Sequence, residues 1–272
     1  MGEFYTDGQK RQIQLTAFEI LKLFDGICRR NNLKYYLTAG SLLGAVRHGG
    51  FIPWDDDVDV AMPREDFDKL LKIAAVELPE GYFYQDSTTD RKYPFLFSKI
   101  RKDGDEVYEK ILDGVDIHKG RYIDIFPLDK CPDNPSVAKK YFKKIEFLKM
   151  AMLEKGSDKF TSGYTRFIPK LVLALFKRLP WGTLRFIRNA TVKYYAARSS
   201  GKRLCTVAGT HGYPKETYDC EWFIGEREMT FEGVSFFVPK ESEQLLQSMY
   251  GDYMTPPDES LRGGHFTNPE SN

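Results

Sequence analysis

The chain has 272 residues and a mass of 31.5 kDa, enough for one large domain or two small ones. With 42% hydrophobic, 29% charged and 14% aromatic residues it is a folded globular protein, and the disordered, collagenous and coiled-coil classes are excluded. Its 40 Lys and Arg nearly balance 39 Asp and Glu, so the net charge of +1 predicts no nucleic-acid partner.

The four cysteines stand singly, which indicates neither a disulfide framework nor a zinc site. Charged residues interrupt residues 1–26 before an apolar run of signal-peptide length can form. We therefore expect a reducing, cytoplasmic setting.

The start of the chain predicts a helix, a short strand and a second helix. Residues 9–31 carry apolar side chains at three- and four-residue steps, the pattern of an amphipathic helix. A strand over 35–38 ends at a Gly-Ser pair, and Ser41 is expected to cap the helix that runs through Val46.

A second strand carries acidic residues. Alternation over 57–62 puts Asp57 and Asp59 on one face, and Asp55 is expected on the same face. A helix is predicted over 64–76, after the proline that ends this strand.

Later strands are predicted over 95–101 and 121–126, and the second of them contains Asp124. The remaining elements are a helix, a hairpin and a last helix, over 136–153, 222–238 and 240–250. Because helices and strands mix without a regular βαβ rhythm, we predict an α+β fold with a mixed sheet flanked by helices. We expect a single domain over 1–272, in which 134–203 is a helical, partly basic amphipathic insertion.

One segment departs from the average charge. Residues 164–203 contain ten Lys and Arg and no Asp or Glu. The rest of the chain therefore has a net charge of −9. Many apolar residues are interleaved with these cations, as in a cationic amphipathic helix. Two interpretations stay open: contact with an anionic membrane surface, or a helical pair that packs one face on the core and exposes the other to water.

The Gly-Ser turn and the acidic strand together predict a metal and phosphate site. A helix N-terminus presents unpaired N–H groups, and Gly40 lets a phosphate approach the backbone. Two carboxylates at alternate strand positions can converge on a hard cation such as Mg²⁺. Asp57 and Asp59 fit that role, and Asp124 can supply a third carboxylate as ligand or general base.

Four segments then resemble the LicD family of phosphocholine transferases. They read GSLLGAVRH over 40–48, GFIPWDDDVDV over 50–60, IDIFPLD over 123–129, and YGDYMTPP over 250–257. The resemblance implies a nucleotidyltransferase-like fold. It also implies transfer of phosphocholine from CDP-choline to a hydroxyl of a cell-surface glycan precursor, of the teichoic acid, lipopolysaccharide or capsule type, with release of CMP.

Carried over residue by residue, the resemblance assigns Asp57 and Asp59 to Mg²⁺, with Mn²⁺ as the alternative ion. Asp124 would complete the metal site or deprotonate the acceptor, and Gly40 and Ser41 would hold the diphosphate. Further basic residues are expected to neutralise the diphosphate or to close over the site, although each also fits a surface ion pair: His48, Lys99, Arg101, Arg121, Arg262 and His265.

Other functions remain compatible with this sequence. The same site could use CDP-ribitol or CDP-glycerol, or could transfer a nucleotidyl group from a nucleoside triphosphate. A catalytically silent, membrane-associated scaffold is the alternative from a different class. The resemblance implies a CDP-alcohol donor and a lipid-linked glycan acceptor, and hence a peripheral position at the inner face of the membrane.

Overall fold

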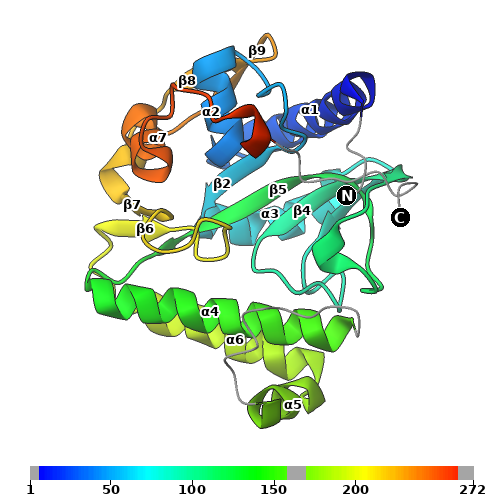
Figure 1. Ribbon diagram of the computed structural model, residues 1–272, viewed down its shortest axis with the longest axis vertical. Coiled ribbons are helices and arrows are strands. Elements are labelled where there is room, and N and C mark those ends of the chain that lie inside the picture. Colours follow the sequence, from blue (N-terminus) through cyan, green and yellow to red (C-terminus); the bar gives the residue numbers. More distant parts are fainter. Residues whose placement is uncertain (1–5, 158–169, 263–272) are drawn as a thin grey trace.

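The computed structural model describes residues 6–157 and 170–262, and a seven-stranded mixed sheet forms its centre (Figure 1). The strands run in the order β1-β2-β5-β4-β3, and β6 and β7 extend the sheet from the end of β5. Only the β2–β5 pair is parallel among the strand pairs of the described residues. The strands are β1 (Tyr36–Leu37), β2 (Asp59–Pro63), β3 (Tyr82–Gln85), β4 (Ser98–Glu106), β5 (Gly120–Lys130), β6 (Arg203–Cys205) and β7 (Thr217–Asp219).

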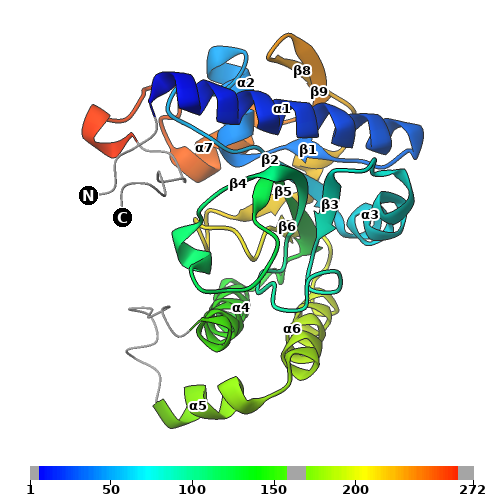
Figure 2. The same ribbon diagram turned by 90° about the vertical axis from the view of Figure 1, so that its right-hand side faces the viewer.

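Helices cover both sides of this sheet. In Figure 1, α1 and α2 lie above it and α4 to α6 lie below it, while Figure 2 shows α3 beside the β3 edge. A separate hairpin of β8 (Glu228–Phe231) and β9 (Val234–Phe237) packs near α2. The helices are α1 (Asp7–Arg30), α2 (Ala39–His48), α3 (Arg64–Glu77), α4 (Pro135–Gly156), α5 (Lys170–Arg178), α6 (Trp181–Ala196) and α7 (Ser242–Tyr250), with short 3₁₀ helices η1 (Lys110–Leu112), η3 (Cys220–Phe223) and η4 (Glu259–Leu261).

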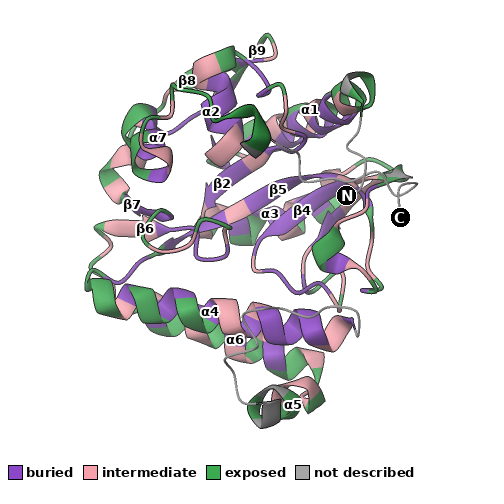
Figure 3. Ribbon diagram, in the orientation of Figure 1, coloured by how far each residue is buried: buried purple, intermediate pink, exposed green. Residues whose placement is uncertain are grey.

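The main core lies between the sheet and the helices above it. The apolar stripe of α1 is fully buried there, with Ile20, Leu21 and Phe24 at 0% exposure, and the central strands are buried along most of their length (Figure 3). A capping box between Thr6 and Gln9 fixes the start of α1. Burial of this stripe explains why the 3.6-residue pattern of the sequence predicts this helix correctly.

The predicted fold class is confirmed, and several elements need correction. Ser41 does not cap α2, because the helix begins at Ala39 and the Ser41 hydroxyl instead accepts a hydrogen bond from the Asp59 N–H. The strand expected over 95–101 begins at Ser98, because the aromatic residues before it pack in a side cluster. The first part of the hairpin expected over 222–238 is the 3₁₀ helix η3, and the strands β3, β6 and β7 were not predicted. The assignment of one domain with 134–203 as an insertion stays a prediction.

The parallel pair is the feature that positions the candidate site. Its register places Asp59, at the start of β2, directly opposite Asp124 on β5. The Asp124 N–H donates to the Val58 carbonyl oxygen at 2.8 Å, and the Thr38 N–H donates to the Asp59 carbonyl oxygen at 3.1 Å. Backbone pairing therefore brings together two acidic residues that are 65 positions apart.

Candidate active site

Carboxylates from two strands converge where β2 begins. One oxygen from each of Asp57, Asp59 and Asp124 lies within 4.8 Å of the other two, and a second group of the same tightness contains Asp55, Asp56 and Asp57. Asp57 and Asp124 are 8% and 7% exposed. An all-oxygen donor set of this kind suits Mg²⁺ or Mn²⁺, and Asp57 is positioned to serve both groups.

The Gly-Ser turn is built against these acids. A Cβ atom on Gly40 would lie 2.5 Å from Asp55 Oδ2, so only glycine lets α2 begin this close to the carboxylate. The Ser41 Oγ accepts from the Asp59 N–H at 2.8 Å. Ala39 has a positive φ of 46°, a costly conformation for a residue with a side chain, at the point where α2 enters the site. The turn therefore fixes the acidic strand and the N-terminus of α2 relative to each other.

A cavity of about 520 Å³ opens above the acids. Its lining combines the start of α2, the acidic strand, the loop before β7, and the chain after α7. The residues that give it its chemistry are Gly40, Arg47, Trp54, Asp55, Asp57, Asp59, His211, Tyr250 and Tyr253. The cavity lining thus combines carboxylates with aromatic rings and an arginine.

Two arginines converge on Trp54 at this cavity. The guanidinium of Arg262 lies 4.6 Å from the indole centroid and that of Arg47 lies 5.9 Å from it. Arg47 Nη1 also donates to the Tyr253 carbonyl oxygen at 2.8 Å, and burial followed by the nearby Arg262 charge lowers the pKa of Arg47. Arg262 also pairs with the exposed Glu259 at 3.5 Å, and the two guanidinium groups together offer several N–H donors to an anionic ligand.

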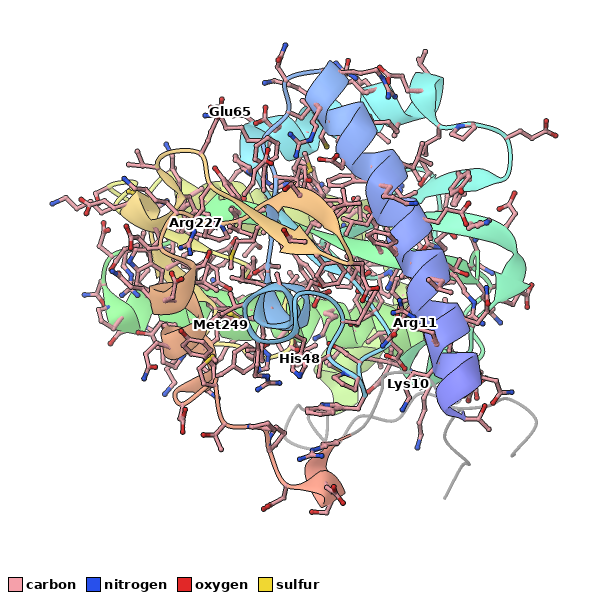
Figure 4. The ribbon with its side chains drawn as sticks, turned by 90° about the horizontal axis from the view of Figure 1, so that it is seen from above. Lys10, Arg11, His48, Glu65, Arg227 and Met249 are labelled. Atoms are coloured by element: carbon pink, nitrogen blue, oxygen red, sulfur yellow. The ribbon has the colours of Figure 1, made fainter. Side chains whose placement is uncertain are left out.

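His48 closes the last turn of α2. Figure 4 looks down on α2, which carries His48 and lies between α1 with Arg11 and α7 with Met249. The imidazole meets Trp54 edge-on at 6.3 Å between centroids. Burial, and then the charge of Arg47, lower the pKa of His48, which therefore favours its neutral form at neutral pH.

Lys99 is paired with Asp124 and is not among the residues that line the cavity. Its Nζ is 2.7 Å from Asp124 Oδ1 and 3.4 Å from Glu109 Oε2, and its side chain is 1% exposed. The ammonium also sits 3.1 Å from the Tyr122 ring centroid. Burial raises the pKa of Asp124 to about 6, although the Lys99 charge acts in the opposite direction. The structure therefore makes Lys99 the immediate cationic partner of Asp124.

The remaining predicted basic residues are dispersed. Arg101 is fully buried and donates to Gln85 Oε1, to the Gly120 carbonyl oxygen and to Glu109 Oε1, at 2.6, 2.6 and 2.8 Å. Arg121 occupies the face of β5 opposite to Asp124, because the two are three positions apart on a strand. These two therefore do not join the cavity, whereas Arg262 does approach it, and His265 lies outside the described residues.

Several residues of the site were missed by sequence reasoning. Glu216 accepts hydrogen bonds from the His211 and Gly212 N–H groups, both at 3.1 Å, and so holds the loop that brings His211 to the cavity. Burial raises the pKa of Glu216 to about 7. Glu109 lies in a polar stretch that gave no signal, and Arg47 belongs to the 40–48 motif but stands seven residues from the Gly-Ser turn.

Residues 32–149, which contain β1 to β5 and all three converging acids, match the nucleotidyltransferase domain of the LicD/FKTN/FKRP family. These residues are a LicD-type nucleotidyltransferase domain. The resemblance to that family is thereby confirmed. The LicD-type domain supplies the carboxylates and the Gly-Ser turn, while Arg262 and His211 come from the chain after it.

Curated proteins extend the similarity beyond the LicD-type domain. The lipopolysaccharide cholinephosphotransferase LicD of Haemophilus influenzae is 27% identical over 263 residues, which cover 94% of this chain and 96% of that protein. The ribitol 5-phosphate transferase FKRP of Homo sapiens is 42% identical over 52 residues, 19% of this chain and 10% of that protein. An uncharacterized Rickettsia prowazekii protein, RP689, is 44% identical over 59 residues, 22% of each chain.

Proposed function

We propose that this protein is a phosphotransferase that moves phosphocholine from CDP-choline to a hydroxyl group of a cell-surface glycan precursor. The acceptor oxygen forms a bond to the choline-side phosphorus while the bond from that phosphorus to the bridging oxygen breaks. CMP leaves with the bridging oxygen, and the hydroxyl proton passes to a base. The acceptor is of the teichoic acid, lipopolysaccharide or capsule type.

One observation carries this proposal. Three carboxylates from β2, its preceding loop and β5 converge beside a helix N-terminus and two arginines, in a chain related along 94% of its length to a cholinephosphotransferase. Carboxylates that hold a cation, opposite arginines that hold an anion, are the two halves of a diphosphate site.

The donor set fits Mg²⁺, with Mn²⁺ as the alternative. Asp57, Asp59 and Asp124 would hold the ion, and it would supply charge neutralisation for the diphosphate when bound. The chain's own residues do the rest: the α2 N-terminus with Gly40 accommodates phosphate oxygens, and Arg47 offers donors from the opposite side. As the alternative to completing the metal site, Asp124 would accept the acceptor proton, and burial raises its pKa to about 6.

Choline favours aromatic surfaces, because a quaternary ammonium has no hydrogen to donate and is held by ring faces. Trp54, Tyr250 and Tyr253 line the cavity and offer such surfaces. Ribitol and glycerol would instead need hydrogen-bonding groups. The aromatic lining therefore favours CDP-choline, while the local similarity to a ribitol 5-phosphate transferase keeps CDP-ribitol as the second candidate.

The experiment that tests this proposal is CMP release from CDP-choline, CDP-ribitol and CDP-glycerol in turn, with and without Mg²⁺. Asp59→Asn is the blank, because it removes one ligand charge and leaves the β2–β5 backbone pairing intact. We expect Mg²⁺-dependent CMP release with CDP-choline that disappears in Asp59→Asn and in Asp57→Asn. Normal activity in either variant would refute the metal assignment.

The same assay separates the alternatives. Release of pyrophosphate from a nucleoside triphosphate would identify nucleotidyl transfer, because a different phosphorus is attacked. Absence of turnover with every donor, in the presence of membrane extract as acceptor source, would identify a non-catalytic scaffold.

We further propose that the acceptor is lipid-linked and that the protein works peripherally at the cytoplasmic face of the membrane. No helix in the described part of the chain has the length and apolar character needed to cross a bilayer. A glycan precursor built on a lipid carrier would bring the hydroxyl to the protein at that surface.

A further inference from the structure

Charge is divided between two parts of the molecule. Residues 134–203, which contain α4, α5 and α6, hold 17 Lys and Arg against three Asp and Glu, a net charge of +14 that leaves the remaining residues at −13. We call residues 134–203 the helical layer. The acidic cavity lies outside it, so a chain with a net charge of only +1 is strongly dipolar.

The cations of the helical layer are largely on its outside. Successive turns of α4 expose lysines while the opposite face of the same helix is buried against α6 and the sheet. In both ribbon views α5 lies farthest from the sheet (Figures 1 and 2). The exposed basic residues of the layer include Lys139, Lys140, Lys143, Lys144, Arg178, Lys193 and Arg198.

Large apolar side chains are exposed among these cations. Phe186 on α6 is 73% exposed, Leu175 on α5 is 53% exposed, and Val172, one helical turn before Leu175, is 37% exposed. Exposure of Phe186 and Leu175 forgoes the favourable burial of two large apolar side chains. Apolar residues surrounded by Lys and Arg on an outer helix face are the pattern of a surface that enters the interface of an anionic bilayer.

We propose that the outer face of α4, α5 and α6 docks onto a membrane rich in anionic phospholipid, with Leu175 and Phe186 inserted among the lipid head groups. This inference rests on the proposed function, since it names the surface that brings the enzyme to a lipid-linked acceptor. Charge complementarity carries it: the layer is cationic, and the cytoplasmic leaflet is negatively charged. The acidic remainder of the molecule is repelled by the same leaflet, so only one face can approach it.

A nucleic acid is the less favoured partner for this surface. The exposed Phe186 and Leu175 favour a partner with an apolar interior beneath its anionic groups, which a bilayer has and a phosphate backbone lacks. A second copy of the chain is also less favoured, because two layers of net charge +14 would repel each other.

The test is co-sedimentation of the full chain with two kinds of vesicle. One contains phosphatidylcholine alone, and the other contains phosphatidylcholine with about 30% phosphatidylglycerol, which gives its surface a negative charge. The variant combines Lys139→Glu, Lys143→Glu, Arg178→Glu and Lys193→Glu, all at exposed positions of the layer. Each cation near an anionic surface contributes about fivefold to partitioning. We therefore expect the wild type to bind the anionic vesicles and the variant to bind at least about 100-fold more weakly.

A matched control changes the same amount of charge elsewhere. Lys22→Glu, Lys34→Glu, Lys72→Glu and Lys240→Glu lie on exposed positions outside the layer, and this variant should bind anionic vesicles like the wild type. A third variant, Leu175→Ser with Phe186→Ser, should lose the binding that persists at 0.5 M NaCl, roughly where charge attraction is screened.

The outcomes are distinct from those of the turnover assay. Equal vesicle binding by the layer variant and its control, or equal binding to neutral and anionic vesicles, would overturn the docking surface whatever the enzyme's donor. Binding to RNA without binding to vesicles would overturn it also. Because sedimentation needs no turnover, loss of CMP release leaves this result unaffected, and the layer variant should retain CMP release from soluble CDP-choline.

Discussion

Lys99→Met removes the buried cation between Asp124 and Glu109 while keeping the length of the side chain. Glu109 retains Arg101 at 2.8 Å and the Tyr122 hydroxyl at 3.1 Å, so the loss falls mainly on Asp124, whose nearest cation was 2.7 Å away. Breaking a buried pair by removing one partner costs about 3–5 kcal/mol. For a chain of this size about 2 °C accompanies each kcal/mol, which predicts a fall in Tm of about 6–10 °C.

Mg²⁺ should restore part of that loss. In the proposed site the metal takes up the Asp124 charge that Lys99 had neutralised, and a ligand at about 100 times its Kd stabilises the folded state by about 2.7 kcal/mol. In wild-type protein Lys99 competes for the same carboxylate, so the stabilisation by Mg²⁺ should be smaller. The assay is urea unfolding at pH 8, with EDTA and with increasing Mg²⁺; at this pH the wild-type Asp124, with its pKa of about 6, is ionised.

Lys102→Met is the matched control on the same strand. Lys102 pairs with Glu19 at 2.8 Å, but both side chains are partly exposed, and such surface pairs contribute about 0–1 kcal/mol. An equal response to Mg²⁺ in Lys99→Met and wild type, or a loss in EDTA no larger than that of Lys102→Met, would refute the role of Lys99 as the partner of Asp124.

Two further predictions concern the edges of the site. Gly40→Ala would place a Cβ 2.5 Å from Asp55 Oδ2, so the carboxylate must shift, and we expect turnover to fall by about 100-fold with an unchanged circular dichroism spectrum. Full activity in Gly40→Ala would show that turnover does not depend on the close approach of Asp55 to residue 40. Glu216 has its pKa raised to about 7 from 4.5 by burial, so the folded protein holds a proton that the unfolded chain releases. Wild-type stability should therefore be highest below pH 4.5 as far as this group is concerned, and fall as the pH rises through 7, by at most about 3 kcal/mol. Glu216→Gln cannot titrate, and urea unfolding at pH 5 and 8 should show a smaller decline; identical pH profiles would contradict the assignment.

The sequence predicted the helices and the acidic centre better than the edges of the fold. The regular apolar stripe of α1 is a local pattern that reads directly as a helix. The strand predicted over 57–62 is shorter in the structure, because β2 begins at Asp59 and Asp57 lies in the loop before it. The strands β6 and β7 have only three residues each, and β6 pairs with the end of β5, which is distant in the sequence. No local sequence pattern therefore predicts them.

The convergence of basic residues was harder to predict than that of acids. Lys99 and Arg101 were expected, on the resemblance, to neutralise the diphosphate, and the register of β4 does pair Lys99 with Asp124. In the structure Glu109, from a loop without a recognisable pattern, pairs with Arg101 at 2.8 Å and with Lys99 at 3.4 Å, and neither cation lines the cavity. Conversely, Arg47 belongs to a motif in which sequence reasoning assigned it no role, and the structure places it beside Trp54 in the cavity lining.

The continuity of β5 has a consequence for the reach of the enzyme. This strand of 11 residues carries Asp124 near its middle and ends at Lys130, and α4, the first helix of the helical layer, begins five residues later with Pro135. Six strand residues span about 20 Å, and a hydrogen-bonded central strand resists bending. If the helical layer rests on the bilayer, the reacting centre is held at a fixed distance from the lipid surface. An acceptor sugar would then be modified according to its distance from the lipid carrier as well as its chemical identity.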